Sequence, residues 1–209
     1  NGLLLVVSGP SGTGKGTICK DIVAKHEDIN LSISATTRNP RVGEVEGKSY
    51  FFKTKEEFEA MVDRGEFLEH AMIYDNYYGT PKKAIFDELD MGRDVILEIE
   101  MQGAMQIKEV YPQAVFIFVL PPSLQELRNR IVGRGTETEE QIEKRFNSAY
   151  DEIKLLGDYD YFIFNNIVEK SSEEILNILE VEKNKVSRYK KDILDMFEKE
   201  IKNVKTIIK

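Results

Sequence analysis

The sequence predicts an α/β fold of three layers, in which helices flank a parallel five-stranded sheet. Three observations support this prediction. Five short apolar segments have the length and the branched side chains of strands that are buried on both faces. Helical stretches separate most of these segments, as in parallel sheets with right-handed crossovers. A glycine-rich segment follows the first apolar run directly, and a helix is expected to begin within it.

The five predicted sheet strands are spread over most of the chain. They are Leu3–Val7, Leu31–Ser34, Val95–Ile99, Val115–Leu120 and Tyr161–Phe164. Residues 35–84 differ in character, because they are rich in Tyr, Phe, Arg and Gly and contain only short strand-like pieces at Ser49–Phe52 and Phe67–Ala71. We interpret them as a small inserted α+β lobe.

A second insertion, residues 126–147, is helical and carries several arginines around Gly133 and Gly135. Glycines beside clustered arginines favour a mobile lid that closes on phosphate. The expected organisation is a core of residues 1–34, 85–125 and 148–209, a lobe of residues 35–84 and a lid of residues 126–147.

Composition narrows the classes of partner. The 209 residues are enough for a sizeable single core, and the net charge of −8 argues against a nucleic-acid partner. Cys19 is the one cysteine, which excludes an internal disulfide and fits a reducing compartment. No apolar run approaches the length of a membrane span, so we expect no membrane partner, no signal peptide and a cytoplasmic location.

The segment Gly-Pro-Ser-Gly-Thr-Gly-Lys-Gly-Thr at residues 9–17 has the pattern of a loop that binds nucleotide phosphates. Gly9, Gly12 and Gly14 let backbone N–H groups approach an anion closely. Lys15 supplies a positive charge for the β- and γ-phosphates, and the helix that begins there directs its positive end at them. The pattern therefore predicts a P-loop.

The loop departs from the strict G-x-x-x-x-G-K-[ST] pattern at one position. Gly16 follows the lysine where the pattern has a hydroxyl residue, and Thr17 offers its hydroxyl one place later. Thr17 is therefore the first candidate for a group near Mg²⁺.

A second anion site is predicted in the lobe. Arg38 and Arg41 are three residues apart, with Tyr50 nearby, and two such arginines hold a phosphate by forked, charge-assisted hydrogen bonds. Residues 69–80 then place an acid, tyrosines and a hydroxyl in one short stretch.

Taken together, these segments resemble the guanylate kinase family over nearly the whole chain. The signatures are the loop at 9–17, T-T-R-x-P-R-x-G-E, E-H-A with N-Y-Y-G-T, I-L-E-I-E-x-Q-G-A, P-P-S, G-R-G-T-E-T and D-Y-x-F-x-N-N, in that order. The resemblance implies ATP as the donor, GMP as the acceptor, Mg²⁺ as the cofactor and a P-loop core with a GMP-binding lobe.

The resemblance also assigns roles to residues. It implies ATP binding by Gly9, Ser11, Gly12, Thr13, Gly14, Lys15, Gly16, Thr17 and Arg130. It implies binding of the GMP phosphate by Arg38, Arg41, Tyr50 and Tyr78, and binding of the base by Ser34, Glu69, Thr80 and Glu100. The catalytic set that it implies is Lys15, Arg38, Arg134 and Arg145.

The chemistry of guanine fits this division. Guanine presents N1–H and N2–H₂ side by side, and two adjacent donors suit one ionised carboxylate such as Glu69. Adenine presents an acceptor there and would leave the carboxylate unpaired, which costs about 1–3 kcal/mol. Thr80 is expected to donate to the guanine O6 atom.

Position 100 departs from the family pattern, which usually has Asp where this chain has Glu100. The additional methylene group leaves the contact of Glu100 open between guanine and metal-bound water. Glu98 is a substitute candidate, because residues two apart in a strand point to the same face.

Two other functions remain open from the sequence. One is a catalytically inactive guanylate-kinase-like module that binds protein segments, although the loop glycines, Lys15 and Arg38 are all retained. The other is a nucleoside-monophosphate kinase with a different acceptor base. A P-loop GTPase has no support, because no N-K-x-D segment occurs.

The C-terminal region is Lys/Glu-rich and helical in pattern, and it extends beyond the usual end of the family. Its apolar residues recur at spacings of three and four, at Val186, Tyr189, Ile193, Phe197, Ile201, Val204 and Ile208. We expect this stripe to pack against the body of the same chain. Self-association through it is the alternative, so the chain is expected to be a monomer or a homodimer.

Overall fold

The computed structural model describes residues 2–73, 75–132 and 139–207. Its main sheet consists of β1 (Leu4–Ser8), β2 (Ile29–Leu31), β7 (Asp94–Glu98), β8 (Val115–Leu120) and β9 (Tyr161–Phe164), in the order β2-β7-β1-β8-β9. Every neighbouring pair in this sheet is parallel. The predicted parallel five-stranded sheet is therefore confirmed.

The second strand was misplaced by the sequence pattern, because only Leu31 belongs both to the predicted segment and to β2. Ile29 is the buried residue of the strand and pairs with Asp94. The amide of Ser32 still donates to the carbonyl of Ile96, at 2.8 Å, and the chain then leaves the sheet for the lobe.

Alternation along β1 explains the three layers. Leu5 and Val7 belong to a buried cluster with α1 (Lys15–Lys25) and α7 (Val168–Glu182). Leu4 and Val6 belong to a second cluster, with α3 (Lys82–Asp90) and α4 (Met101–Val110). Because successive side chains of a strand point to opposite faces, helices cover both sides of the sheet.

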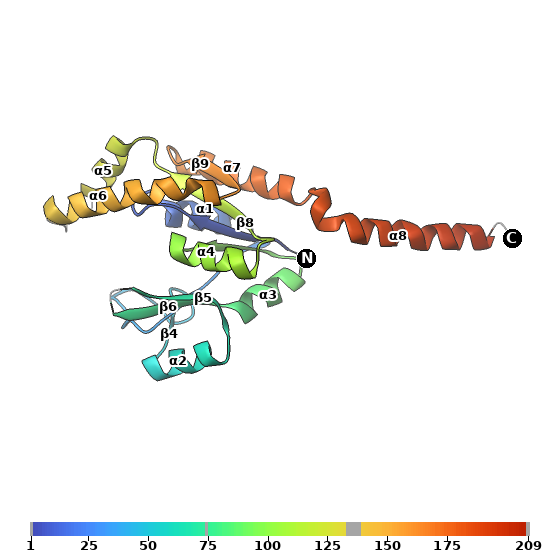
Figure 1. Ribbon diagram of the computed structural model, residues 1–209, viewed down its shortest axis with the longest axis horizontal. Helices are drawn as coiled ribbons and strands as arrows, with labels where there is room; N and C mark the ends of the chain where they lie inside the picture. Colours follow the sequence, from blue (N-terminus) through green and yellow to red (C-terminus); the bar gives the residue numbers. More distant parts are fainter. Residues whose placement is uncertain (1, 74, 133–138, 208–209) are drawn as a thin grey trace.

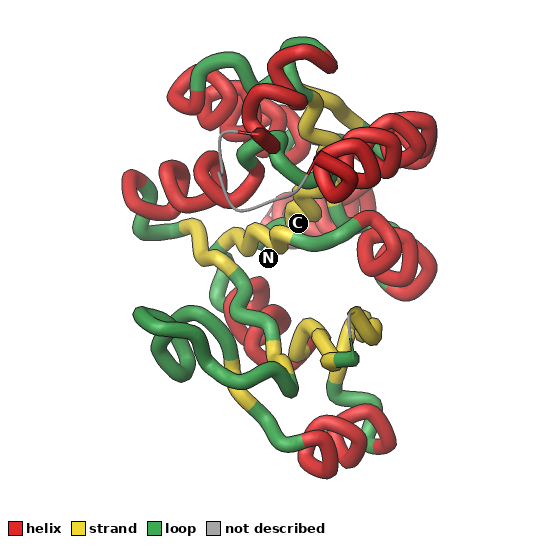
Figure 2. Tube along the Cα trace, turned by 90° about the vertical axis from the view of Figure 1, so that its left-hand side faces the viewer, coloured by secondary structure: helices red, strands yellow, loops and turns green. Residues whose placement is uncertain are grey.

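A second sheet forms the lobe. It contains β4 (Phe51–Phe52), β3 (Ala35–Thr36), β6 (Asn76–Pro81) and β5 (Phe67–Ile73), in that spatial order. The helix α2 (Lys55–Asp63) packs on it through buried Phe58, whose ring stacks on Phe67 at 4.5 Å between centroids. Figure 2 shows this lobe as a separate group of elements below the main sheet.

Two helices make up most of the region expected to form the lid, residues 126–147. They are α5 (Leu124–Val132) and α6 (Glu139–Ile153), which continues into the 3₁₀ helix η1 (Lys154–Asp158). They lie side by side above the main sheet in Figure 1, and their buried residues Leu127, Ile131 and Ala149 form a cluster. Residues 133–138 lie outside the described ranges.

The last helix, α8 (Val186–Ile207), runs away from the body of the molecule (Figure 1). Its apolar residues Val186, Ile193, Phe197 and Ile201 are 45–69% exposed. The expectation that this stripe packs against the body is therefore wrong for these four residues, whereas Tyr189, near the start of α8, is half-buried. Self-association stays a hypothesis, and Ile208 and the side chain of Val204 lie outside the description.

The start of α8 is attached to the core by a buried carboxylate. Glu182, at the end of α7, accepts hydrogen bonds from Tyr161 at 2.6 Å, from Lys185 at 3.0 Å and from Nε of Arg188 at 2.9 Å. Arg188 also donates to the carbonyl of Gln113 at 2.7 Å. Across the described ranges, no helix has both the length and the hydropathy that a bilayer span requires.

Candidate active site

The glycine-rich loop joins β1 to α1, and its shape requires glycine. Gly9 has a φ of 142°, and a Cβ atom there would lie 2.4 Å from the carbonyl oxygen of Val119. Gly14, which precedes the first residue of α1, has a φ of 88°. These left-handed conformations are strained for any other residue, so replacing either glycine would disfavour this conformation of the loop.

Lys15 opens α1 and is folded back over the loop. Its Nζ atom donates to the carbonyl oxygens of Gly9, at 2.5 Å, and Pro10, at 3.1 Å, and the side chain is buried. Thr13 is also turned inward, because its hydroxyl donates to the carbonyl of Pro10 at 2.9 Å. The lysine charge is therefore held at the centre of the loop.

One cavity of about 670 Å³ connects this loop to the lobe within the described part of the chain. Eleven of the predicted site residues line it: Ser11, Gly12, Gly14, Lys15, Gly16, Thr17, Ser34, Tyr50, Glu69, Tyr78 and Glu100. Gly9, Thr13, Arg38, Arg41, Thr80 and Arg130 are not among its lining residues. The P-loop lysine and the carboxylate of the lobe thus face the same space.

The lobe end of the cavity is built around Glu69 of β5. Its side chain is buried, and its Oε1 atom accepts a hydrogen bond from the hydroxyl of Thr80 on β6, at 2.6 Å. Burial raises the pKa of Glu69, and the hydrogen bond from Thr80 lowers it in part. The hydroxyl that was expected to contact guanine O6 is therefore donated to Glu69 in this structure.

Gly103 of α4 was not singled out from the sequence, but it lies against the same carboxylate. A Cβ atom at Gly103 would come within 2.9 Å of the Oε2 atom of Glu69 and 2.5 Å of the Ile99 side chain. Close approach between α4 and β5 therefore depends on this glycine. Gly103 is the glycine of the Q-G-A segment noted in the sequence, but the sequence does not show that Glu69 lies against it.

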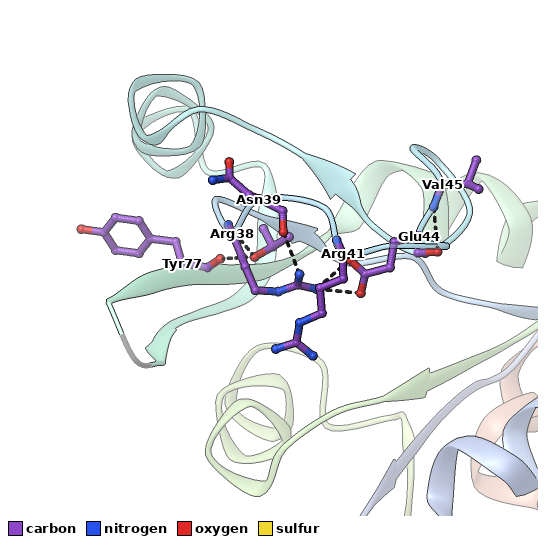
Figure 3. Close-up of polar contacts among 8 residues, drawn as sticks. Arg38, Asn39, Arg41, Glu44, Val45 and Tyr77 are labelled. Carbon is purple, nitrogen blue, oxygen red and sulfur yellow. Dashed lines mark hydrogen bonds and ion pairs between the residues drawn. The ribbon is translucent and has the colours of Figure 1, made fainter. Parts of the chain in front are cut away.

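Arg38 is held in place by an acid that sequence reasoning did not assign. Its guanidinium donates to both carboxylate oxygens of Glu44, at 2.8 and 3.1 Å, and to the carbonyl of Asn39 at 2.7 Å (Figure 3). The Glu44 carboxylate raises the pKa of Arg38. It also accepts the backbone N–H of Arg41 at 2.7 Å. Glu44 therefore organises the whole turn that carries the two arginines.

The two arginines point differently. The guanidinium of Arg41 extends away from the Arg38–Glu44 pair (Figure 3). The guanidinium carbon of Arg38 lies 5.5 Å from the ring centre of Tyr50, and that ring meets Tyr78 edge to face at 6.1 Å. The predicted phosphate-binding side chains Arg38, Tyr50 and Tyr78 are thus brought together.

Arg130 bridges the predicted lid to the P-loop through backbone atoms. It donates to the carbonyls of Asn165, at 3.1 Å, and Thr13, at 3.4 Å, and its Nε pairs with Glu126 at 2.9 Å. Asn165, which sequence reasoning missed, donates to the same Thr13 carbonyl at 2.7 Å. Arg134 lies outside the described residues, and so does the side chain of Arg145.

Two acids, Glu98 and Glu100, lie close to the end of β7. Glu98 is its last residue, and Glu100 precedes the first residue of α4. Both line the cavity. Burial raises the pKa of Glu98 above its ordinary value. The positive charges of Lys15 and Lys20 oppose this shift in part, and the negative charge of Glu100 adds to it. The carboxylates give this end of the site oxygen donors that Mg²⁺ prefers.

Comparison with known proteins agrees with this geometry. The family model described as "Guanylate kinase" matches residues 1–182. The chain belongs to the guanylate kinase family. It is 66% identical to a guanylate kinase of Clostridioides difficile over 200 residues, which cover 96% of this chain and 98% of the relative. A guanylate kinase of Caldanaerobacter subterraneus is 56% identical over 90% of this chain and 92% of its own length.

A solved structure extends the similarity to the fold. The guanylate kinase of Anaplasma phagocytophilum superimposes with a TM-score of 0.72 and 37% identity, over 88% of this chain and 87% of that one. The family model ends at Glu182, where α7 ends, so α8 lies beyond the matched region.

Proposed function

We propose that this guanylate kinase family member transfers the γ-phosphoryl group of ATP to GMP, reversibly and with Mg²⁺, giving ADP and GDP in purine nucleotide metabolism. One observation carries the proposal. A single cavity is lined at one end by the P-loop with Lys15 and at the other by the buried carboxylate of Glu69. Such a space suits two nucleotides that meet at their phosphates.

In this proposal the P-loop binds the donor. Backbone N–H groups of the loop and the positive end of α1 stabilise the negative charge of the phosphates. Lys15 then moves from the loop carbonyls to the β- and γ-phosphates. The proposed ATP-binding residues are Gly9, Ser11, Gly12, Thr13, Gly14, Lys15, Gly16, Thr17 and Arg130. The structure suggests that Thr13 and Arg130 act by holding the loop, since their side chains bond to backbone carbonyls.

The lobe binds the acceptor. Glu69 accepts the N1–H and N2–H₂ groups of guanine, with Ser34, Thr80 and Glu100 around the base. Arg38, Arg41, Tyr50 and Tyr78 hold the GMP phosphate, for which Arg38 exchanges part of its pairing with Glu44. A buried carboxylate opposite the adenine N1 acceptor is left unpaired, which favours guanine over adenine about ten- to a hundredfold.

Catalysis is proposed to consist of alignment and charge neutralisation, with Lys15, Arg38, Arg134 and Arg145 as the catalytic residues. The attacking group is an oxygen of the GMP phosphate, already ionised at neutral pH, so no general base is required. Closure of the lid brings arginine charge to the transferred group and excludes water. An Arg134→Ala variant is then expected to lose about 10³–10⁵ in turnover.

The residues present fit Mg²⁺, because Thr17 offers a hydroxyl and Glu98 and Glu100 offer carboxylates in the same cavity. When bound, Mg²⁺ neutralises phosphate charge.

We also propose a core of residues 1–34, 85–125 and 148–209, a lobe of residues 35–84 and a lid of residues 126–147. The protein is proposed to be a monomer or a homodimer and to be located in the cytoplasm. The buried thiol of Cys19, the one cysteine of the sequence, fits a reducing compartment.

A coupled assay tests this function directly. GMP, AMP, CMP and UMP are each offered with ATP and Mg²⁺, and formation of ADP is followed. Fast ADP formation with GMP alone supports the proposal, and equal rates with another base overturn the assignment of the acceptor. Absence of ADP with every acceptor would instead favour the protein-binding module.

A further inference from the structure

Glu152 is a half-buried acid that has no part in the proposed reaction. It is the second-last residue of α6, and it is not among the residues that line the large cavity. Its Oε1 atom accepts a hydrogen bond from the hydroxyl of Ser148 at 3.1 Å. Its Oε2 atom is buried and has no hydrogen-bond partner in the described part of the chain. A buried polar atom without a partner is costly, so the fold keeps this carboxylate against an unfavourable free energy of burial.

Packing on both sides of Glu152 fixes its position. Ala149, on the same helix, belongs to a buried cluster with residues of α5. Ile153, the next residue, packs against the buried cluster that contains Phe118 of β8. At this point α6 is therefore held between α5 and the main sheet, above which it lies in Figure 1. The side chain of Glu152 leaves the helix from a backbone that has little freedom to move.

The electrostatic surroundings of Glu152 show that it lies beside the P-loop. Burial raises the pKa of Glu152 above its ordinary value, and the negative charge of Glu100 adds to this shift. The hydroxyl of Ser148, the positive charge of Lys15 and the backbone N–H of Ser11 lower the pKa in part. Because an N–H group acts on a carboxylate only at short range, the Ser11 amide lies next to Glu152. Glu152 therefore faces the loop from outside the cavity, on the side of α6.

The orientation of the peptide between Pro10 and Ser11 explains why an acceptor is needed on this side. Its carbonyl, on Pro10, is turned into the loop, where it accepts hydrogen bonds from Nζ of Lys15 at 3.1 Å and from the hydroxyl of Thr13 at 2.9 Å. The peptide is trans, so its N–H points the opposite way. With the carbonyl held inside the loop, the N–H of Ser11 is directed outward, toward Glu152.

We propose that Glu152 is a positioning residue of the donor site, which holds the peptide between Pro10 and Ser11 from the side of α6 and so orients the loop that binds the donor phosphates. The inference rests on the proposed function, since it takes the loop to bind a nucleotide. Glu152 touches neither nucleotide and acts through Ser11, which lines the cavity. When Lys15 leaves the Pro10 carbonyl for the phosphates, the N–H side of the same peptide remains held. The contact also joins the helix that follows the predicted lid to the P-loop.

Binding of a non-hydrolysable ATP analogue, measured by titration calorimetry, tests this role in two variants of similar size. Glu152→Gln keeps an oxygen that can accept the N–H of Ser11, whereas Glu152→Met keeps the volume and removes the acceptor. We expect Glu152→Met to weaken binding of the analogue about tenfold, and Glu152→Gln to weaken it by less than about threefold. Binding of GMP should be unchanged in both variants, because the acceptor end of the cavity is built by the lobe.

Two other roles of Glu152 give different results. If Glu152 is only a negative charge near the phosphates, both variants lose a repulsion and bind the analogue more tightly than the unmodified protein, which overturns the inference. If Glu152 only fills space, the two variants bind with equal affinity, which overturns it as well. Circular dichroism checks that each variant is folded. Should Glu152→Met not fold, the sign of the change in Glu152→Gln still separates positioning from repulsion.

The amide signal of Ser11 in the NMR spectrum of the nucleotide-free protein gives a second readout. An amide proton that donates to a carboxylate resonates at lower field than one that does not. Glu152→Met should therefore move the Ser11 signal upfield, and Glu152→Gln should move it less. A Ser11 signal that responds to neither variant would mean that Glu152 does not hold this peptide, and the inference would fail.

Glu109→Met is the matched control, since Glu109 is exposed near the end of α4 and does not line the cavity. It should bind both nucleotides as the unmodified protein does. Failure of this inference is distinguishable from failure of the proposed function, because affinity for the ATP analogue and the Ser11 signal report on Glu152, whereas GMP-dependent formation of ADP reports on the reaction. A protein that forms ADP with GMP, but whose analogue affinity and Ser11 signal are unchanged by Glu152→Met, retains its proposed function and loses this inference.

Discussion

Thr80 and Glu69 face each other across two antiparallel strands, and the hydroxyl of Thr80 donates to Oε1 of Glu69 at 2.6 Å. The two residues lie on β6 and β5, and both are buried. The contact leaves the Oε2 atom of Glu69 to face α4 at Gly103. One oxygen of the carboxylate is therefore anchored by the lobe, which orients the other toward the acceptor end of the cavity.

Glu69→Gln is expected to weaken GMP binding by about ten- to a hundredfold, since an amide cannot accept both donors of guanine and one polar group is left unpaired. Binding of ATP should not change, because the P-loop lies at the other end of the cavity. Titration calorimetry with each nucleotide measures both effects. Glu66→Gln, at an exposed carboxylate that precedes β5, is the control. Equal losses for GMP and ATP would contradict the assignment.

Binding of GMP is expected to weaken as the pH falls. Burial raises the pKa of Glu69 above its ordinary value of 4.5, so the carboxylate becomes protonated at a higher pH than an exposed glutamate. Only the ionised form accepts both guanine donors. Affinity for GMP should therefore decrease as the pH falls through this raised pKa, which a calorimetric series between pH 8 and pH 5 would follow.

The phosphate of GMP titrates in the same range, and Glu69→Gln separates the two effects. In that variant the part of the pH dependence that belongs to Glu69 should disappear, and the part that belongs to the phosphate should remain. Identical pH profiles in both proteins would show that Glu69 is not the titrating group.

Glu44→Ala is expected to raise KM for GMP about tenfold with a smaller change in kcat. The carboxylate holds both the guanidinium of Arg38 and the amide of Arg41, so without it the arginines must be ordered when GMP binds. Steady-state kinetics with varied GMP measures the effect. Glu59→Ala, at an exposed carboxylate on α2, should leave KM unchanged. A lower KM in Glu44→Ala would mean that Glu44 competes with the phosphate instead of preparing the site.

Local patterns were enough to predict the sheet and the loop. Burial of β1 on both faces follows from the apolar run Leu3–Val7, and Gly9, Gly12 and Gly14 of the P-loop lie where left-handed conformations occur. The start of β2 was missed because its pairing with β7, through Ile29 and Asp94, is a contact between distant segments. No local pattern records which residue of an edge strand meets its neighbour.

Contacts between distant segments also explain what was missed in the site. Asn165 reaches the carbonyl of Thr13 over 152 positions of sequence, and Gly103 matters only because Glu69 lies against it. Glu98 was noted as a substitute for Glu100, but its place in the cavity beside the P-loop depends on the register of β7 against β1. Most side chains of the site could be identified from the sequence, whereas the contacts between them follow only from the fold.

Glu182→Gln is expected to lower the free energy of unfolding by about 1.5–3 kcal/mol at neutral pH, because it removes the buried negative charge that accepts hydrogen bonds from Arg188 and Lys185. Burial opposes ionisation, but hydrogen bonds from Tyr161, Arg188 and Lys185 outweigh it and lower the pKa of Glu182 to about 2. Urea unfolding followed by circular dichroism measures the difference.

The pH dependence of this effect has a definite sign. The folded pKa lies below the ordinary value of 4.5, so the contribution is fully present above about pH 4.5 and is lost as the pH falls toward 2. The difference between the two proteins should therefore shrink over that interval. Glu180→Gln, whose side chain is 69% exposed, should change stability little at any pH. A difference that stays constant down to pH 2 would exclude the ion pairs as its source.

Two truncations of α8 should have opposite effects, although they differ by only three residues. Ending the chain after Lys190 keeps Arg188 and its contacts with Glu182 and Gln113, and it removes a helix whose apolar side chains are largely exposed. Thermal stability and GMP-dependent turnover should then stay close to those of the full chain. Ending it after Ser187 removes Arg188 and leaves Glu182 buried with less charge compensation, which should lower the melting temperature clearly. If the first truncation is as damaging as the second, α8 beyond Lys190 contributes to the stability of the core in a way that its exposed position does not explain.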